Sequence, residues 1–277
     1  MTSYAERLTA ATESRGRLCV GIDPQPRILA SWDLPLDVSG LERCARGMVE
    51  ALGDLVPVFK PQSAFFEAHG SAGVAVLERT LRDIADAGAL SLLDVKRGDI
   101  GSTMAGYAAA YLADGSSLAA DAITLNPYLG FGSLDGAIDL AVSSGRGVYV
   151  VALSSNPEGS AIQRARIHDG RTVGQLIIDE AAGRNPGPGL GSVGVVVGAT
   201  ISAPEVDFGT LNGSILAPGL GAQGATATDL ARVFGPARAH VLPAMSREVM
   251  RGGPAAAALR DAVQRALGEM AAVLAVG

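Results

Sequence analysis

The chain has 277 residues, of which 48% are hydrophobic and only 4% are aromatic. This length is normal for a single α/β barrel, and the low aromatic content means that Ala, Val, Leu and Ile must fill its core. The 22 basic and 28 acidic residues give a net charge of −6, which argues against a general affinity for nucleic acid or for an anionic membrane surface.

The cysteines and the uncharged segments indicate a cytoplasmic protein. Cys19 lies in an apolar, strand-like run and Cys44 in a helix-like segment, so we expect two buried, reduced thiols rather than a disulfide or a metal site. The first 17 residues carry charges throughout and lack the apolar stretch of a signal peptide. A long uncharged run, residues 185–204, is interrupted by Gly and Pro and is unsuited to a membrane helix.

In chain order, strand-like and helix-like patterns alternate. Residues 3–15 are expected to form a short amphipathic helix. Strands are predicted at residues 18–23, 56–61, 90–96, 122–128, 147–153, 193–200, 214–218 and 239–243. Helices are predicted at residues 39–54, within 64–87, at 99–113, 131–144, 172–183, 204–211 and 228–234, and from Pro254 onward. Residues 154–171, including His168, form a long polar loop of the kind used as a lid or binding loop.

This alternation predicts parallel βαβ units. Eight repeats without a linker indicate one closed (β/α)8 TIM barrel with an N-terminal helix, spanning residues 1–277. The count of eight depends on the weak last strand, and a doubly wound open sheet is the alternative architecture.

Polar residues follow the predicted strands at their carboxyl ends, where barrels of this kind build their sites. They are Asp23, Lys60, Asp94 with Lys96, Ser154 with Ser155, Thr200, the segment from Pro218 to Gln223, and Ser246 with Arg247. Because these ends meet at one rim, the sequence predicts a single active site there.

The stretch SLLDVKRGDIGST at residues 91–103 carries the densest cluster of charges. Asp94 and Lys96 are two residues apart on a strand, so their side chains should project from the same face. Asp99 is expected to open the next helix, where a negative charge is favoured. Each charge alone is compatible with an ordinary surface role. Together they favour catalysis, because carboxylates beside Lys96 keep it protonated and able to deliver a proton to carbon.

The last two strands suit a phosphate group. The Gly-rich segment after Pro218 lets backbone N–H groups approach an anion, and Arg247 follows strand eight. If the register of that strand differs, Arg251 or Arg238 would take this role. We find no cluster with metal-ligand spacing and no dinucleotide-binding Gly motif, so neither metal nor organic cofactor is expected.

The ordered motifs of the chain resemble those of the orotidine 5'-phosphate decarboxylase family. The pattern Asp-x-Lys-x-x-Asp-Ile-x-x-Thr of the third predicted strand is the most specific, and its residues are similar to those of the bacterial branch of the family. The other motifs are Gly21-Ile22-Asp23-Pro24, Phe59-Lys60, Ser155-Asn156-Pro157, Pro218-Gly219-x-Gly221-Ala222-Gln223-Gly224 and Ser246-Arg247. The resemblance implies decarboxylation of orotidine 5'-phosphate to UMP, the last step of pyrimidine synthesis, without metal or organic cofactor, by a homodimer with shared active sites.

The resemblance also implies roles for individual residues. Lys96 would protonate C6 of the substrate as its carboxylate leaves, with Asp94 against that carboxylate. Asp99 and Thr103 would reach the site of the partner subunit. The remaining roles are a charge network and ribose contacts for Lys60, ribose contacts for Asp23 and Thr103, a pyrimidine contact for Ser155, and substrate binding for Pro218, Gln223 and Arg247, the last two at the phosphate.

Two other functions remain open at this point. A sugar-phosphate decarboxylase or isomerase on the same barrel would use Mg²⁺ and needs further carboxylates near Lys60. The next acidic residue, Glu67, lies seven positions further, within or near the following helix. A non-catalytic barrel that binds a phosphate ligand would be expected to have a broken charge cluster, whereas this one is whole.

Overall fold

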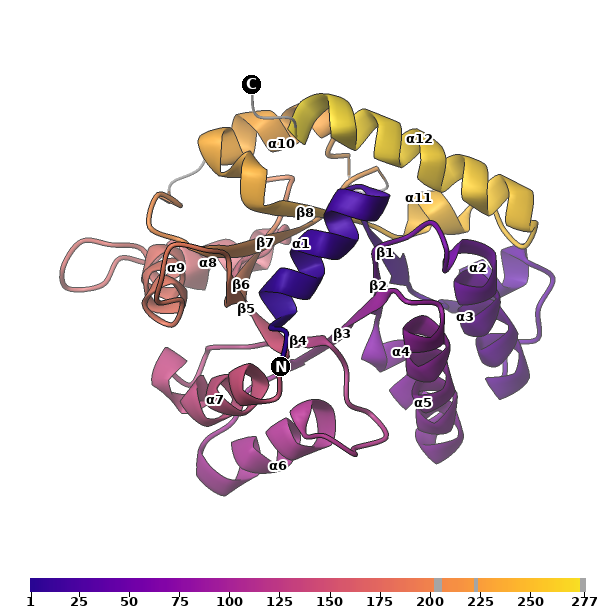
Figure 1. The fold of residues 1–277 in the computed structure, drawn as a ribbon, viewed down its shortest axis with the longest axis horizontal. Coiled ribbons are helices and arrows are strands. Elements are labelled where there is room, and N and C mark those ends of the chain that lie inside the picture. The colour runs from indigo at the N-terminus through magenta and orange to yellow at the C-terminus, as the bar shows by residue number, and fades with distance from the viewer. Residues whose placement is uncertain (202–205, 222–223, 275–277) are drawn as a thin grey trace.

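Eight parallel strands close into a barrel in the computed structural model, which describes residues 1–201, 206–221 and 224–274 (Figure 1). The strands are β1 (Cys19–Ile22), β2 (Val58–Pro61), β3 (Leu90–Arg97), β4 (Ala122–Leu125), β5 (Gly147–Leu153), β6 (Gly191–Val197), β7 (Gly213–Pro218) and β8 (Val241–Met245). Each pairs in parallel with its neighbour in sequence, and β1 also pairs with β8. The prediction of a (β/α)8 barrel is confirmed, and the alternative prediction of a doubly wound open sheet is wrong.

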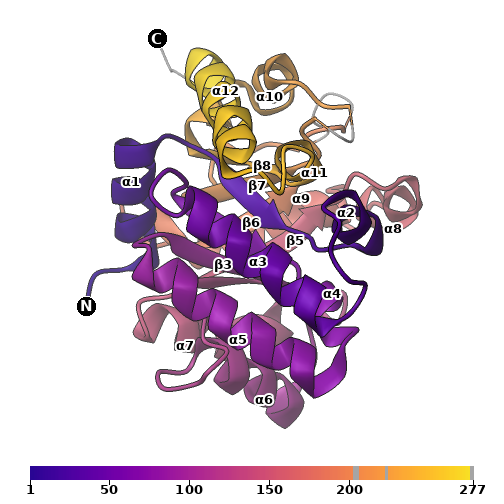
Figure 2. The same ribbon diagram turned by 90° about the vertical axis from the view of Figure 1, so that its right-hand side faces the viewer.

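Helices surround the barrel, except α1, which lies across one end of it (Figures 1 and 2). They are α1 (Tyr4–Arg15), α2 (Pro26–Ser31), α3 (Val38–Leu52), α4 (Ser63–Glu67), α5 (Gly70–Asp86), α6 (Gly101–Leu112), α7 (Asp135–Ser143), α8 (Ser160–Gln163), α9 (Val173–Gly183), α10 (Ala227–Phe234), α11 (Arg247–Met250) and α12 (Ala256–Leu274). Short 3₁₀ turns are η1 (Phe131–Leu134), η2 (Pro157–Gly159) and η3 (Gly235–His240). No helix in the described ranges is both long and apolar enough to span a membrane.

The helix expected within residues 64–87 is present as α5. The short helix α4 is separate from it, because Gly70 adopts a left-handed φ of 60° and Gly73 packs where a Cβ would lie 2.0 Å from the Phe66 carbonyl oxygen. The helix expected to open at Asp99 begins at Gly101 instead, and the Asp99 carboxylate accepts a hydrogen bond from the N–H of Ile100.

Two further predictions near the C-terminus are wrong in detail. Strand eight lies two residues later than expected, because residues 235–240 form the turn η3. The expected helix at 204–211 is not present in its described part, residues 206–211, where the Asp207 carboxylate accepts a hydrogen bond from the N–H of Gly209 and stabilises a turn.

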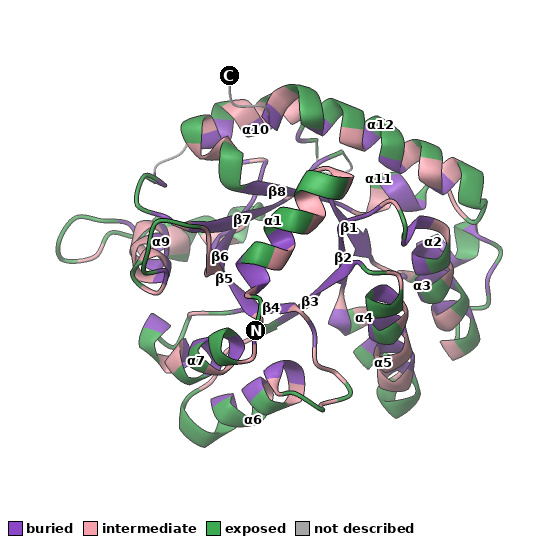
Figure 3. Cartoon of the chain, in the orientation of Figure 1, coloured by how far each residue is buried: buried purple, intermediate pink, exposed green. Residues whose placement is uncertain are grey.

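The barrel interior is apolar except at one end. Figure 3 shows the strands as buried and the outward faces of the helices as exposed. At the amino ends of the strands α1 lies across the barrel (Figure 2), and the Tyr4 hydroxyl lies 3.1 Å from that of Tyr149 on β5. Cys19 and Cys44 are buried free thiols, as predicted. Because α1 covers this end, ligand access to the interior is through the carboxyl ends of the strands.

Candidate active site

A cavity of about 270 Å³ opens at the carboxyl ends of the strands. Each of the eight strands, or the residues directly after it, contributes to its wall. The predicted site residues that line it are Asp23, Lys60, Asp94, Lys96, Ser155, Pro218 and Arg247. Gln223 lies outside the described residues, and Asp99 and Thr103 do not line the cavity.

Asp94 lies between the two lysines. Its Oδ2 accepts a hydrogen bond from Lys60 Nζ at 3.1 Å, and its Oδ1 accepts one from Lys96 Nζ at 2.6 Å. Thr124 donates a third hydrogen bond to Oδ1 at 2.8 Å. Asp94 and Lys60 are buried, whereas the side chain of Lys96 is 48% exposed and faces the cavity. The Lys96 ammonium group therefore faces the cavity, where a ligand would bind, while the buried Asp94 carboxylate holds it in place.

This pairing keeps both buried groups charged at neutral pH. Burial alone would raise the pKa of Asp94, but attraction to Lys60 and Lys96 outweighs it and holds that pKa well below its usual range. Burial would lower the pKa of Lys60, but the carboxylates of Asp94 and Asp23 outweigh it and hold that pKa above its usual range. The cavity floor is therefore a fixed alternation of charges.

Replacing Lys60 with methionine should lower the free energy of unfolding at pH 7 by about 3 kcal/mol, because it leaves the buried Asp94 carboxylate with fewer partners. The ionised Asp94 stabilises the fold at pH values above the ordinary carboxyl pKa, and this contribution is lost as the pH falls through the lowered pKa of Asp94. The charged Lys60 stabilises the fold at pH values below the ordinary lysine pKa, and this contribution is lost as the pH rises through the raised pKa of Lys60. The difference should thus be constant between about pH 5 and pH 9 and shrink near pH 3.

Urea denaturation at a fixed protein concentration measures this difference. The matched control is Arg82→Met, which breaks the exposed ion pair of Arg82 with Glu78 and should change stability little. Equal effects of the two substitutions would contradict the buried charge network.

The local geometry of β3 depends on a bulge. Leu93 pairs with Ile123 and Arg97 with Leu125, so between these pairs β3 has three residues where β4 has one. Lys96 lies in the bulge with a φ of 42°, a left-handed backbone conformation that residues other than glycine rarely adopt. Gly98 follows where a Cβ would lie 2.1 Å from the Asn126 carbonyl oxygen, so only glycine lets the chain turn away there. The expected meeting of Asp94 and Lys96 on one face is confirmed, but through a bulge rather than a regular strand.

Asp23 presents an unsatisfied acceptor to the same cavity. Its Oδ1 is buried and has no hydrogen-bond partner among the described residues. A buried acceptor without a donor is unfavourable, and a ligand hydroxyl would satisfy it.

Arg247 is the first residue of α11 and follows β8, the strand that pairs with β1. It is half-buried and lines the cavity, and its side chain has no hydrogen bond or ion pair with the part of the chain that the structure describes. By contrast, Arg251 pairs with Glu248 at 2.9 Å and Arg238 donates to the Gly235 carbonyl, and neither lines the cavity. Although strand eight is shifted, Arg247 therefore remains the candidate for an anionic ligand.

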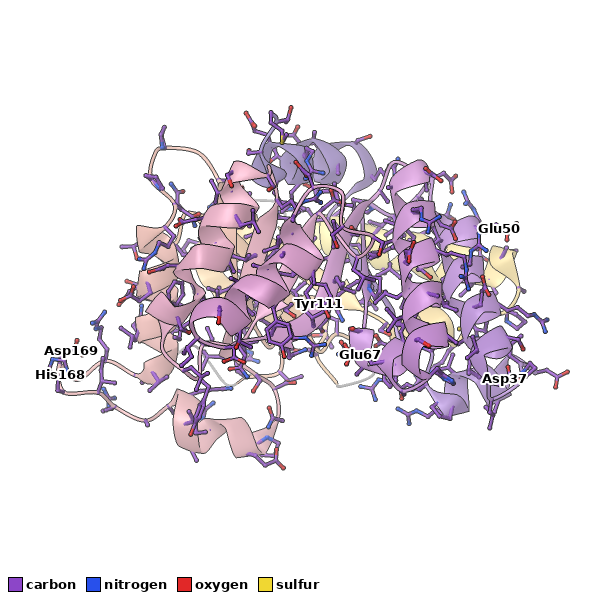
Figure 4. All side chains as sticks on the ribbon, turned by 90° about the horizontal axis from the view of Figure 1, so that it is seen from below. Asp37, Glu50, Glu67, Tyr111, His168 and Asp169 are labelled. Atoms are coloured by element: carbon purple, nitrogen blue, oxygen red, sulfur yellow. The ribbon has the colours of Figure 1, made fainter. Side chains whose placement is uncertain are left out.

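The loops after β7 and β5 complete the rim. Gly219 has a left-handed φ of 112° and lines the cavity with Leu220. After β5, the N–H of Ser154 donates to Gln163 Oε1 at 2.9 Å, and Gln163 Nε2 donates to Ser154 Oγ at 2.8 Å. These bonds fold the loop back onto its start. His168 lies at its outer tip, away from the barrel, with Asp169 (Figure 4), as expected of a solvated residue.

Glu67 is not available to the cavity. It accepts hydrogen bonds from Arg97 and from Ser63, each at 2.6 Å, and lies beside Tyr111 on the outside of the barrel (Figure 4). Within the described ranges, no group of three or more His, Cys, Asp or Glu residues is placed to hold a metal ion. The extra carboxylates that an Mg²⁺-dependent sugar-phosphate enzyme needs beside Lys60 are thus not found there.

Three features of the site were not predicted. Thr124 and Gln62 line the cavity, and Gln62 Oε1 lies 3.5 Å from Lys60 Nζ. The third feature is the lysine count: the sequence has 20 arginines and only two lysines, Lys60 and Lys96. Arginine cannot give up a proton in a protein, whereas lysine can, so this restriction is a signal in the sequence that marks the site.

Comparisons with known proteins agree with this geometry. A family model described as Orotidine 5'-phosphate decarboxylase / HUMPS family matches residues 16–262. The orotidine 5'-phosphate decarboxylase of Salinispora arenicola is 59% identical over 275 residues, 99% of each chain, and that of Streptomyces coelicolor is 54% identical over 267 residues, 96% of each chain.

Solved structures extend the agreement to three dimensions. A crystal structure of a relative from Streptomyces avermitilis has a TM-score of 0.97 and 52% identity, covering 100% of this chain and 97% of that one. The orotidine 5'-phosphate decarboxylase of Leishmania donovani has a TM-score of 0.77 and 27% identity, covering 99% of each chain. With the family model matched over most of its length and relatives more than half identical, this chain belongs to the orotidine 5'-phosphate decarboxylase / HUMPS family.

Proposed function

We propose that this protein decarboxylates orotidine 5'-phosphate to UMP in the cytoplasm, as a step of pyrimidine biosynthesis that uses neither metal nor organic cofactor. The observation that carries the proposal is the Lys60–Asp94–Lys96 network at the cavity floor. Relatives also support the proposal, because the Salinispora arenicola and Streptomyces coelicolor proteins, each more than half identical to this chain, are orotidine 5'-phosphate decarboxylases.

The cavity lining supports one orientation of this substrate. We propose that Arg247 and the Gly-rich segment after β7 bind the phosphate, with the role of Gln223 following from the family resemblance alone, and that the unpaired Asp23 oxygen accepts a hydrogen bond from a ribose hydroxyl. Ser155 and Pro218 line the remaining wall, which we propose for the pyrimidine. In this proposal C6 of the pyrimidine faces Lys96, whose side chain is the more exposed of the two lysines.

The reaction then needs one bond cleavage and one proton transfer. The bond between C6 and the carboxylate breaks, CO₂ leaves, and the electron pair remains on C6. The Lys96 ammonium, fixed by Asp94 at 2.6 Å, stabilises that charge and then donates its proton to C6. Lys96 regains a proton from solvent. Phosphate binding at Arg247 is remote from C6 and contributes binding energy to the transition state.

The loss of orotidine 5'-phosphate absorbance should proceed at an unchanged rate in metal-free buffer with EDTA, because the proposed chemistry uses only side chains. A parallel assay offers sugar phosphates with Mg²⁺, the substrates of the alternative function. Turnover of a sugar phosphate that depends on Mg²⁺, or no turnover of orotidine 5'-phosphate by folded protein, would contradict the proposal.

We also propose a homodimer whose subunits share their sites through Asp99 and Thr103. Both residues lie outside the cavity of their own chain, and Thr103 is exposed on α6. Beside them, Ile100 (62% exposed), Tyr128 (74%) and Leu129 (52%) form an exposed apolar patch. The loops that carry these residues are in contact, since the N–H of Asn126 donates to the Arg97 carbonyl at 2.8 Å. A second copy that covers this patch would bring the partner's Asp99 toward Lys96.

Mixing two inactive variants tests this arrangement. Lys96→Ala and Asp99→Ala should each be inactive alone, but after random re-pairing half of the dimers are mixed and each contains one intact site. We expect about a quarter of wild-type activity to return, measured after dilution and reassociation. If Asp99 acted within its own chain, or if sedimentation gave a monomer, no activity would return.

A further inference from the structure

Thr124 occupies the position opposite the β3 bulge. It lies on β4 between Ile123 and Leu125, the residues that pair with the two ends of the bulge, Leu93 and Arg97. Its exposed fraction is 1%, and it lines the cavity. The side chain is therefore enclosed between the strand that carries the catalytic charges and the cavity itself.

The Thr124 hydroxyl closes a ring of hydrogen bonds. Its Oγ1 accepts from the backbone N–H of Lys96 at 2.9 Å and donates to Asp94 Oδ1 at 2.8 Å. Lys96 Nζ donates to the same Oδ1 at 2.6 Å. One hydroxyl thus holds both ends of Lys96, directly at the backbone and through Asp94 at the ammonium. A hydroxyl is suited to this position because it accepts and donates at one atom.

The backbone of Lys96 needs such support. The bulge removes the regular pairing partner of its N–H, and a left-handed φ of 42° is unfavourable for a residue with a side chain. The hydrogen bond to Thr124 satisfies that N–H and thereby favours the bulged conformation over a regular strand. The position of Nζ relative to the cavity depends on this conformation.

We propose that Thr124 is a positioning residue that fixes the Lys96 ammonium for proton transfer by holding the β3 bulge and the Asp94 carboxylate together. The proposal rests on the decarboxylase function argued above. It assigns to β4 a role in the reaction although Thr124 itself transfers no proton.

The test compares Thr124→Val, which keeps the shape of the side chain but removes the hydroxyl, with Thr124→Ser, which keeps the hydroxyl. We expect kcat for orotidine 5'-phosphate to fall about 10²-fold in Thr124→Val with KM changed less than about threefold, since positioning affects the transition state more than binding. Thr124→Ser should retain kcat within about fivefold. Thr124→Ala removes the same hydroxyl without branching and keeps the test available if the valine variant does not fold.

A second readout does not depend on activity. Because Lys60 and Lys96 are the only lysines, protein labelled with ¹⁵N-lysine gives two side-chain ammonium signals, and Lys96→Ala assigns them. In Thr124→Val the Lys96 signal should move or broaden more than the Lys60 signal, because Thr124 bonds the Lys96 backbone as well as Asp94, whereas Lys60 contacts only the other oxygen of Asp94.

The two readouts separate the possible failures. A purely structural role would lower the melting temperature of Thr124→Val but leave kcat and the Lys96 signal unchanged, which would overturn the proposal. A similar fall of kcat in Thr124→Ser would also overturn it. If wild-type protein does not decarboxylate orotidine 5'-phosphate, the proposed function fails instead, and an unmoved Lys96 signal would then reject the positioning role independently.

Discussion

Replacing Lys96 with alanine should lower kcat/KM for orotidine 5'-phosphate by at least about 10⁴-fold, because it removes both the proton donor and a fixed positive charge. The ammonium group faces the cavity and is held 2.6 Å from Asp94. The substitution should leave the fold intact, since Asp94 keeps its bonds to Lys60 and Thr124 and the Lys96 side chain is half exposed. Absorbance loss and release of labelled CO₂ both measure the effect, and the melting temperature checks folding.

Lys96→Arg separates the two contributions. Arginine keeps a positive charge beside Asp94 but does not give up a proton. We expect activity above that of Lys96→Ala and still at least about 10²-fold below wild type. Near-normal turnover by Lys96→Arg would reject proton donation by Lys96, and a Lys96→Ala variant within tenfold of wild type would reject the whole assignment.

The prediction that Lys96 and Asp94 share a site followed from their order along β3 and from the rule that barrel sites lie at strand ends. That rule also identified Asp23, Lys60 and Arg247 before any geometry was known. Each of these follows a strongly apolar strand, so its place at the rim depends on little else. The strands themselves were predictable because their apolar runs are bounded by Gly, Pro or charge.

Features that depend on contacts between strands were not predictable. The β3 bulge arises from pairing with β4, and nothing in residues 90–97 alone indicates a left-handed φ at Lys96. In the sequence Thr124 is typical of an ordinary strand residue, and its contact with the β3 bulge becomes evident only from the pairing of β3 with β4. The start of β8 was misplaced because residues 239–241 are compatible with both a strand and the end of the turn η3. The role proposed for Asp99 involves a second copy of the chain, so the fold of one chain cannot test it.

Replacing Arg247 with alanine should raise KM for orotidine 5'-phosphate and lower kcat/KM by about 10²- to 10³-fold, the loss expected when a charged hydrogen-bonded pair with a phosphate is removed. Arg247 lines the cavity just after the end of β8, and its side chain has no hydrogen-bond or ion-pair partner among the described residues. Its guanidinium group is therefore available to a ligand. Arg251→Ala is the matched control, because Arg251 pairs with Glu248 outside the cavity and should not affect turnover.

The nucleoside orotidine, which lacks the phosphate, shows whether the loss belongs to that group. If Arg247 binds the phosphate, wild type and Arg247→Ala should convert orotidine at equally low rates and differ only on the phosphorylated substrate. If Arg247→Ala slowed the turnover of both substrates equally, Arg247 would stabilise the structure of the cavity rim rather than bind the phosphate. A loss in Arg251→Ala as large as that in Arg247→Ala would place the anion near Arg251, just past the end of α11. Because the phosphate is remote from C6, a lowered kcat in Arg247→Ala would further show that its binding energy is used in the transition state.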